Sequence, residues 1–98
     1  MVTALVLISI ERGKINDVVQ RLLSFDGVTE VFSVAGHYDA VAILRTPTND
    51  GIADLVTDKL RSIPFILKTE TMMAFRAFSR DDLGAAFAIG NDEPALGS

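Results

Sequence analysis

The sequence predicts an α+β domain in which a four-stranded antiparallel sheet carries both of its helices on one face. Three observations predict this class. An apolar run rich in β-branched residues opens the chain at 2–10, and two later segments repeat apolar residues at intervals of three and four. Further strand-like runs separate these segments, which gives the order βαββαβ, the split βαβ pattern of ferredoxin-like folds.

The first half of the pattern runs from residue 2 to residue 34. A strand over 2–10 precedes a helix within 13–25, which Gly27 follows as a stop signal, and a second strand is expected over 28–34. The apolar face of this helix consists of Ile15, Val18, Val19, Leu22 and Leu23.

The second half repeats the same order. A strand over 39–45 ends before Pro47, a helix over 49–63 starts at Thr48 or Asn49 as its cap, and a long final strand covers 65–78. The loop at 36–38 joins the second and third strands into a hairpin.

The first strand is apolar on both faces. Val2, Ala4, Val6, Ile8 and Ile10 alternate with Thr3, Leu5, Leu7 and Ser9, and only one of these sets can pack on the helices. Each large aliphatic side chain left in water loses ~1.5–3 kcal/mol of hydrophobic stabilisation. Summed over the second face of both copies, this loss exceeds the entropic cost of association, which is about 4–15 kcal/mol. We therefore expect two copies to pack sheet against sheet in a dimer, unless residues 79–98 cover the second face.

Residues 79–98 form a separate tail after a single domain at 1–78. The tail is Gly-rich and holds four acids and one base, so it is poorly suited to cover an apolar face. The stretch "DDLGAAFAI" within it could form one or two helical turns, and the remainder is expected to be loose.

Composition excludes several classes of protein. The net charge is −4 and no stripe of Lys and Arg is present, so direct binding to nucleic acid is not expected. No apolar run is long enough to span a membrane, and no signal peptide is recognisable. The chain has no cysteine, which fits a cytoplasmic protein.

The segment "GHYD" holds the only histidine and the only tyrosine of the chain. His37 and Asp39 stand close enough in sequence to suggest a catalytic pair, but this spacing is not specific, and a single histidine does not make a metal site. We predict no catalytic residue, metal or cofactor. Gly36 suits a tight turn through positive φ, and Asp39 can accept backbone hydrogen bonds there.

The same loop also matches the two charged ends of a free amino acid. Backbone N–H groups of a glycine turn can hold a carboxylate, the Asp39 carboxylate can hold an ammonium group, and Tyr38 can close one side of a pocket.

The chain resembles the ligand-binding (RAM) domain of the Lrp/AsnC transcription regulators over residues 2 to about 78. The resemblance lies in the βαββαβ order, "GHYD" in the hairpin, "PTNDGI" at the second helix, and "KTETMMAF" in the last strand. It implies dimers formed through the sheets, assembly into tetramers or octamers, and an effector amino acid bound where dimers meet. The residues that it implies for this site are Gly36, His37, Tyr38, Asp39, Thr69, Thr71 and Met72, with Met73 and Ala74 as further candidates.

The chain departs from full regulators of that family because it begins directly at the first sheet strand. Nothing in it resembles a helix-turn-helix, so we expect a stand-alone, non-catalytic sensor that acts by associating with full-length regulators. Two alternatives remain: a cofactor-free enzyme of the dimeric ferredoxin-like type that uses His37 or Asp39, and an interaction module without a ligand. For Thr69 and Thr71 the alternative is strand propensity, and for Met72 it is packing.

Overall fold

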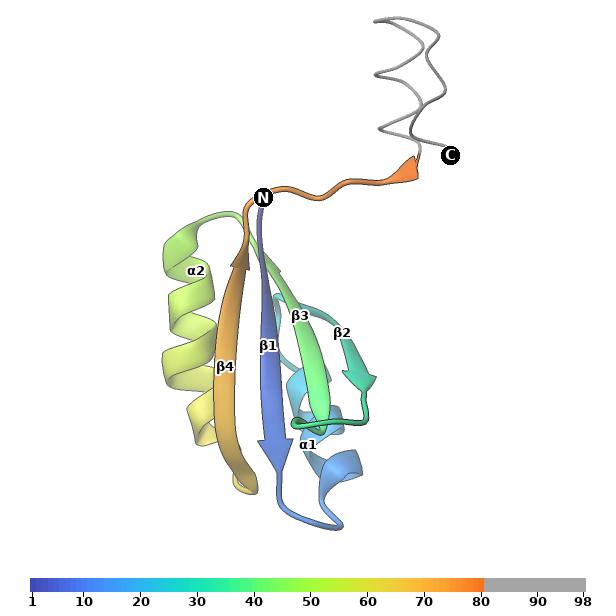
Figure 1. Cartoon of the computed structure of the whole chain (residues 1–98). Helices are drawn as coiled ribbons and strands as arrows, with labels where there is room; N and C mark the ends of the chain where they lie inside the picture. Colours follow the sequence, from blue (N-terminus) through green and yellow to red (C-terminus); the bar gives the residue numbers. More distant parts are fainter. Residues whose placement is uncertain (81–98) are drawn as a thin grey trace, which may run out of the picture.

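The computed structural model describes residues 1–80 and confirms the predicted order of elements (Figure 1). Four strands and two helical segments follow one another along the chain. They are β1 (Val2–Ile10), α1 (Ile15–Leu23), β2 (Val28–Ser33), β3 (Ala40–Thr46), α2 (Asn49–Asp54) with its continuation to Ser62, and β4 (Ile66–Ala74). The short helix predicted in the tail lies outside the described residues.

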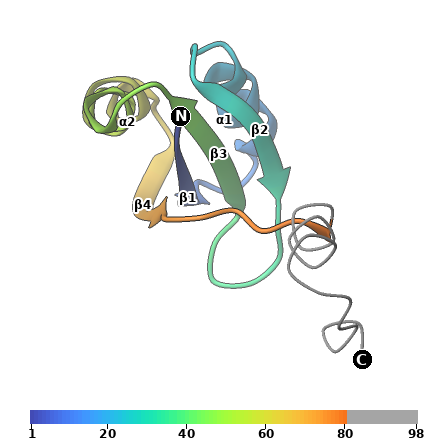
Figure 2. The same ribbon diagram turned by 90° about the horizontal axis from the view of Figure 1, so that it is seen from above.

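The strands form one antiparallel sheet in the order β2-β3-β1-β4. β1 lies in the interior of the sheet, where it pairs with β3 on one side and with β4 on the other. Both helices cover the same face, and within residues 1–80 no helix lies on the opposite face (Figure 2). The predicted fold class is therefore confirmed.

The core lies between the sheet and the helices, and β1 supplies its centre. Ala4, Val6 and Ile8 are fully buried, and they alternate with half-buried residues that point to the other face. Val18 and Leu22 of α1 pack onto this surface as predicted, whereas Leu23, which the sequence also assigned to the apolar face of the helix, is 50% exposed. The remaining buried apolar residues come mainly from β3, α2 and the segment that follows α2: Ala40, Ala42, Leu44, Ile52, Leu55, Leu60 and Ile63.

The second helical segment covers the predicted range but changes its winding along the way. α2 is followed by a π-helical stretch, Leu55–Lys59, and by a 3₁₀ turn, Leu60–Ser62. Of the two predicted cap residues, Thr48 is the N-cap of α2, because its hydroxyl accepts the N–H of Gly51 at 3.2 Å. The wide π turn lies beside the edge strand β4, where it lines two hollows described below.

The last strand is shorter than predicted: it spans Ile66–Ala74 and not 65–78. Its final pairing joins Ala74 to Thr3, one residue after the start of β1, and residues 75–78 are outside the strand. The predicted end of this strand was wrong because it relied on the apolar residues among 75–78. Side-chain type does not reveal where the neighbouring strand β1 begins.

The turn before β4 holds a non-glycine residue with positive φ. Phe65 has φ 77° directly after Pro64, a backbone conformation that costs a side-chain-bearing residue about 1–3 kcal/mol. Two contacts hold it: the N–H of Glu11 donates to the Phe65 carbonyl at 2.8 Å, and the Lys14 ammonium lies 4.8 Å from the centre of the ring. The loop after β1 and the turn before β4 are thus joined.

Among the helices of residues 1–80, none combines the length and the apolar character that crossing a membrane would require.

The close approach of α2 to β3 gives a test of the packing. A Cβ added to Gly51 would lie 2.8 Å from the Cβ of Thr46, which is buried, so we expect Gly51→Ala to destabilise the fold by about 1–3 kcal/mol. Ala53→Gly, on the same helix, should cost about 1 kcal/mol by helix propensity alone. Urea unfolding measures both. A Gly51→Ala variant more stable than the wild type would show that propensity outweighs the contact.

Candidate functional site

The connection between β2 and β3 is a loop over residues 34–39, wider than the predicted 36–38, at the end of the sheet where β1 finishes. Gly36 has φ 140°, and a side chain there would meet no atom within 4 Å, so positive φ and not crowding explains the glycine. The N–H of Val34 donates to the carbonyl of Asp39 at 3.0 Å and closes the loop. His37 is exposed at its tip.

Asp39 ties this loop to the central strand. Its N–H donates to the carbonyl of Ile8 at 2.8 Å, and its carboxylate Oδ2 accepts the N–H of Ile10, also at 2.8 Å. Ile10 stands at the β1 position where the register with β4 shifts, and the carboxylate satisfies its N–H. Asp39 therefore has the structural role of a turn residue, and it fills this role through Oδ2. The bond to Ile10 does not use the second carboxylate oxygen, Oδ1.

Tyr38 ties the loop to the edge strand. Its hydroxyl donates to Oε1 of Glu70 at 2.8 Å, and the Lys68 ammonium lies 5.6 Å from the centre of its ring. The hydrogen bond to Glu70 raises the pKa of the Tyr38 phenol above its usual value of 10.0, and desolvation and the charge of Glu70 act in the same direction. The sequence contains no direct sign of this contact, since it depends on the pairing register that sets Glu70 opposite Leu7.

The alternation of β4 divides the predicted residues of the last strand between two faces. Met72 pairs with Leu5 and lies on the helix-free face with Glu70 and Lys68. Thr69 and Thr71 lie on the helix-covered face, beside α2 and the π-helical stretch. The structure thus brings Tyr38 to Glu70 and Lys68, and it does not bring the loop to the two threonines of the same chain.

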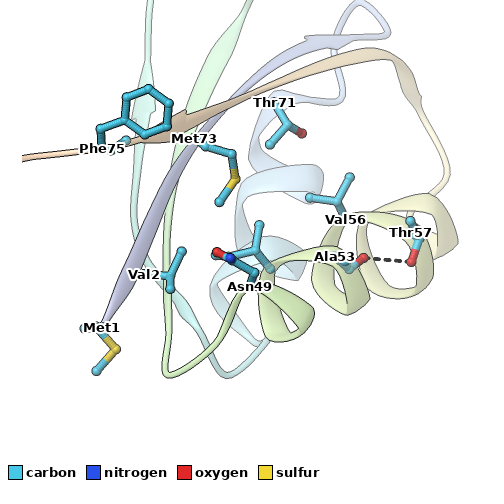
Figure 3. A pocket seen from close by; sticks show the side chains of 11 residues that line it. Met1, Val2, Asn49, Ala53, Val56, Thr57, Thr71, Met73 and Phe75 are labelled. Atoms are coloured by element: carbon cyan, nitrogen blue, oxygen red, sulfur yellow. Dashed lines mark hydrogen bonds between the residues drawn. The ribbon is translucent and has the colours of Figure 1, made fainter.

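An open hollow of about 670 Å³ lies between β4 and α2 (Figure 3). Met73 and Thr71 face it from β4, and Val56 and Asn49 face it from the helical side. Its polar groups are few, and the Thr57 hydroxyl donates to the Ala53 carbonyl at 2.7 Å. A second hollow of about 200 Å³, lined by Thr69, Leu60 and Arg61, lies further along the same edge. The larger hollow suits apolar groups, whereas the smaller one also presents Arg61 and Lys68 and is more polar, and only the alternation of β4 pointed to them in the sequence.

The polar side chains of residues 1–80 do not form a group of three or more metal-ligating residues. The Asp39 carboxylate bonds a backbone N–H, and His37 is exposed at the loop tip. A general base needs a partner that orients it, and this geometry gives the histidine–aspartate interpretation no support.

The single tyrosine offers a direct test of the contact between the loop and β4. We expect Tyr38 to ionise above pH 10.0, and Glu70→Gln to lower its pKa toward that value, because the neutral amide holds the phenolic proton less strongly. The stabilising effect of this hydrogen bond is full below the ordinary tyrosine pKa and is lost as the pH rises through the raised value.

Ultraviolet absorbance measures the titration of Tyr38 without interference from tryptophan, which the chain lacks. Glu30→Gln, at the opposite edge of the sheet, is the control. An unchanged titration in Glu70→Gln would contradict the contact.

Solved structures similar to this chain include a protein of Thermus thermophilus, TTHA0845. It is 36% identical, with a TM-score of 0.76, and the match covers 82% of this chain and 100% of the other. Two regulators crystallised with L-methionine share the fold, at 23% identity (TM-score 0.69) for the feast or famine regulatory protein of M. tuberculosis and 16% (TM-score 0.67) for NMB0573 of Neisseria meningitidis. Their matches cover 83% and 81% of this chain and 54% and 53% of theirs.

Curated relatives are longer than this chain. The regulator YugG of Bacillus subtilis is 27% identical over 81 residues, which are 83% of this chain and 48% of that protein, so the chain spans about half the length of the curated relatives it matches. The family model described as the Lrp/AsnC ligand binding domain matches residues 3–83. The chain therefore belongs to the Lrp/AsnC ligand-binding domain family.

Proposed function

We propose that this chain is a non-catalytic sensor that binds a free amino acid where two of its dimers meet. The observation that carries the proposal is the division of the predicted residues between the two sides of the sheet. Tyr38 of the loop contacts Glu70 on the helix-free face, whereas Thr69 and Thr71 lie on the helix-covered face of the same protomer, so a site that uses both needs two protomers. A ligand held in this way would bind only to the assembly.

The chemistry of the loop fits the constant part of an amino acid. The exposed backbone at Gly36 and His37 can hold the α-carboxylate, and Oδ1 of Asp39 can accept the α-ammonium while Oδ2 stays on Ile10. The apolar wall of the hollow beside β4 suits an uncharged side chain, and Met73, which faces this hollow, adapts easily to its shape. The two related regulators crystallised with L-methionine make this amino acid the first to test.

The dimer would form through the helix-free face of the sheet. We define the open face by its apolar residues, which come from all four strands: Leu5, Leu7, Phe32, Val41, Ile43 and Met72. Met72 is 44% exposed and Phe32 is 49% exposed. Burying such a patch against a second copy contributes roughly 25 cal/mol for each Å² of apolar surface.

Ligand binding would then be linked to assembly. An amino acid that binds only where dimers meet favours that assembly by mass action, and the assembly in turn favours the ligand. Association with full-length regulators of the same family would carry the signal to transcription.

Calorimetric titration with the twenty amino acids, methionine first, tests the ligand. We expect Asp39→Asn to weaken binding at least tenfold, because the amide still accepts the Ile10 N–H but no longer carries the charge that attracts the ammonium. Asp26→Asn, in the turn at the other end of β2, removes the same charge and should bind as the wild type does. If no amino acid binds at millimolar concentration, the sensor is excluded, and the interaction module without a ligand becomes the better proposal.

Sedimentation of a charged variant tests the dimer. Leu7→Lys places a cation at the middle of the open face in both copies, and losing about 1.5 kcal/mol per copy should raise the dimer Kd at least about a hundredfold. Leu23→Lys puts the same change on an exposed position of α1 and should leave Kd unchanged. Equal dissociation constants for both variants would exclude the open face as the interface.

A further inference from the structure

We infer that residues 75–78 form an arm with which each protomer contacts its partner in the dimer. This inference rests on the proposed sheet-to-sheet dimer and adds an element to it that neither the sequence pattern nor the open face indicates. The arm comprises Phe75, Arg76, Ala77 and Phe78, directly after β4.

The arm presents two large aromatic side chains to solvent. Phe75 is 97% exposed and Phe78 is 72% exposed, although a phenylalanine buries some 150 Å² or more when it packs. Two such residues so close together are a frequent mark of an interaction surface. Residues 1–80 give them little packing because β4 pairs with β1 only as far as Ala74 and Thr3, although Phe75 also borders the hollow between β4 and α2.

The direction of the arm identifies the occupant as a second copy. In Figure 2 the arm leaves the end of β4 on the side of the sheet away from both helices, and it runs across toward the β2 side. Figure 1 shows that it does so beyond the end of the sheet where β1 begins, so the arm does not cover the open face of its own chain. A partner sheet packed on the open face would lie on the side to which the arm extends.

The length of the arm matches the thickness of the proposed interface. Four extended residues span up to about 13 Å, and two sheets packed face to face lie about 10 Å apart. Four extended residues are therefore long enough to bridge two such sheets at the rim of the interface, where Phe75 and Phe78 would contact the partner. The exchange is reciprocal under two-fold symmetry, so the dimer gains two arms.

A single tryptophan at the end of the arm tests the inference, because the chain contains no tryptophan of its own. In Phe78→Trp we expect blue-shifted emission at concentrations where the protein is dimeric, and a shift to the red on dilution with the same midpoint as dimer dissociation. Leu23→Trp, at an exposed position of α1, should emit in the red at every concentration.

A second variant measures what the arm contributes. The double variant Phe75→Ser with Phe78→Ser should fold normally, since neither side chain packs in the core, and its dimer Kd should rise at least tenfold.

The experiments distinguish an error in the proposed arm from an error in the proposed dimer. A wild-type protein that sediments as a monomer overturns the proposed dimer and the arm with it. A wild-type dimer whose Kd the double variant leaves unchanged overturns the arm alone, and so does emission from Phe78→Trp that is red throughout. Blue emission that dilution does not change would show that the arm packs on its own chain, which also overturns it.

Discussion

The double apolar character of β1 is the constraint on which the rest of the structure depends. Its even residues form the centre of the core, and its odd residues form the middle of the open face. Because side chains alternate along a strand, one segment of nine residues specifies both where the helices pack and where a second sheet can pack. The neighbours β3 and β4 extend the same two surfaces on either side.

Under the proposed function, the hairpin loop would combine two tasks that the sequence presents as alternatives. Asp39 is a structural residue, since its backbone and one carboxylate oxygen bond to β1, and the same side chain is also the best candidate to meet an ammonium group. Tyr38 connects the loop to β4 through Glu70. A ligand at the loop would therefore contact groups that are bonded to the central strand and to the edge strand, and the latter contact lies on the open face.

Local periodicity predicted most of the fold because each strand and helix shows its burial in its own residues. The spacing of Val18 and Leu22 needed no information from elsewhere in the chain, whereas β1 is apolar on both faces, so its own residues did not show which set packs on the helices. The end of β4 could not be predicted in this way, since it depends on where β1 begins. The contact between Tyr38 and Glu70 likewise depends on a pairing register between distant segments. For the site, the sequence identified a loop that the structure holds firmly, but it could not show that Thr69 and Thr71 face the helices.

The strained turn at Phe65 has a consequence for how a ligand would bind. It is joined to the loop after β1 by Glu11 and Lys14, and the same end of the sheet holds the hairpin loop through Ile8 and Ile10. The loop after β1, the turn before β4 and the hairpin loop are thus all held in place around the end of β1. A binding loop already fixed in this way loses little conformational entropy when it receives its ligand. A small molecule with few contacts could then still bind with useful affinity, and in the proposed assembly its selectivity would depend on the shape of the surface that the neighbouring protomer brings.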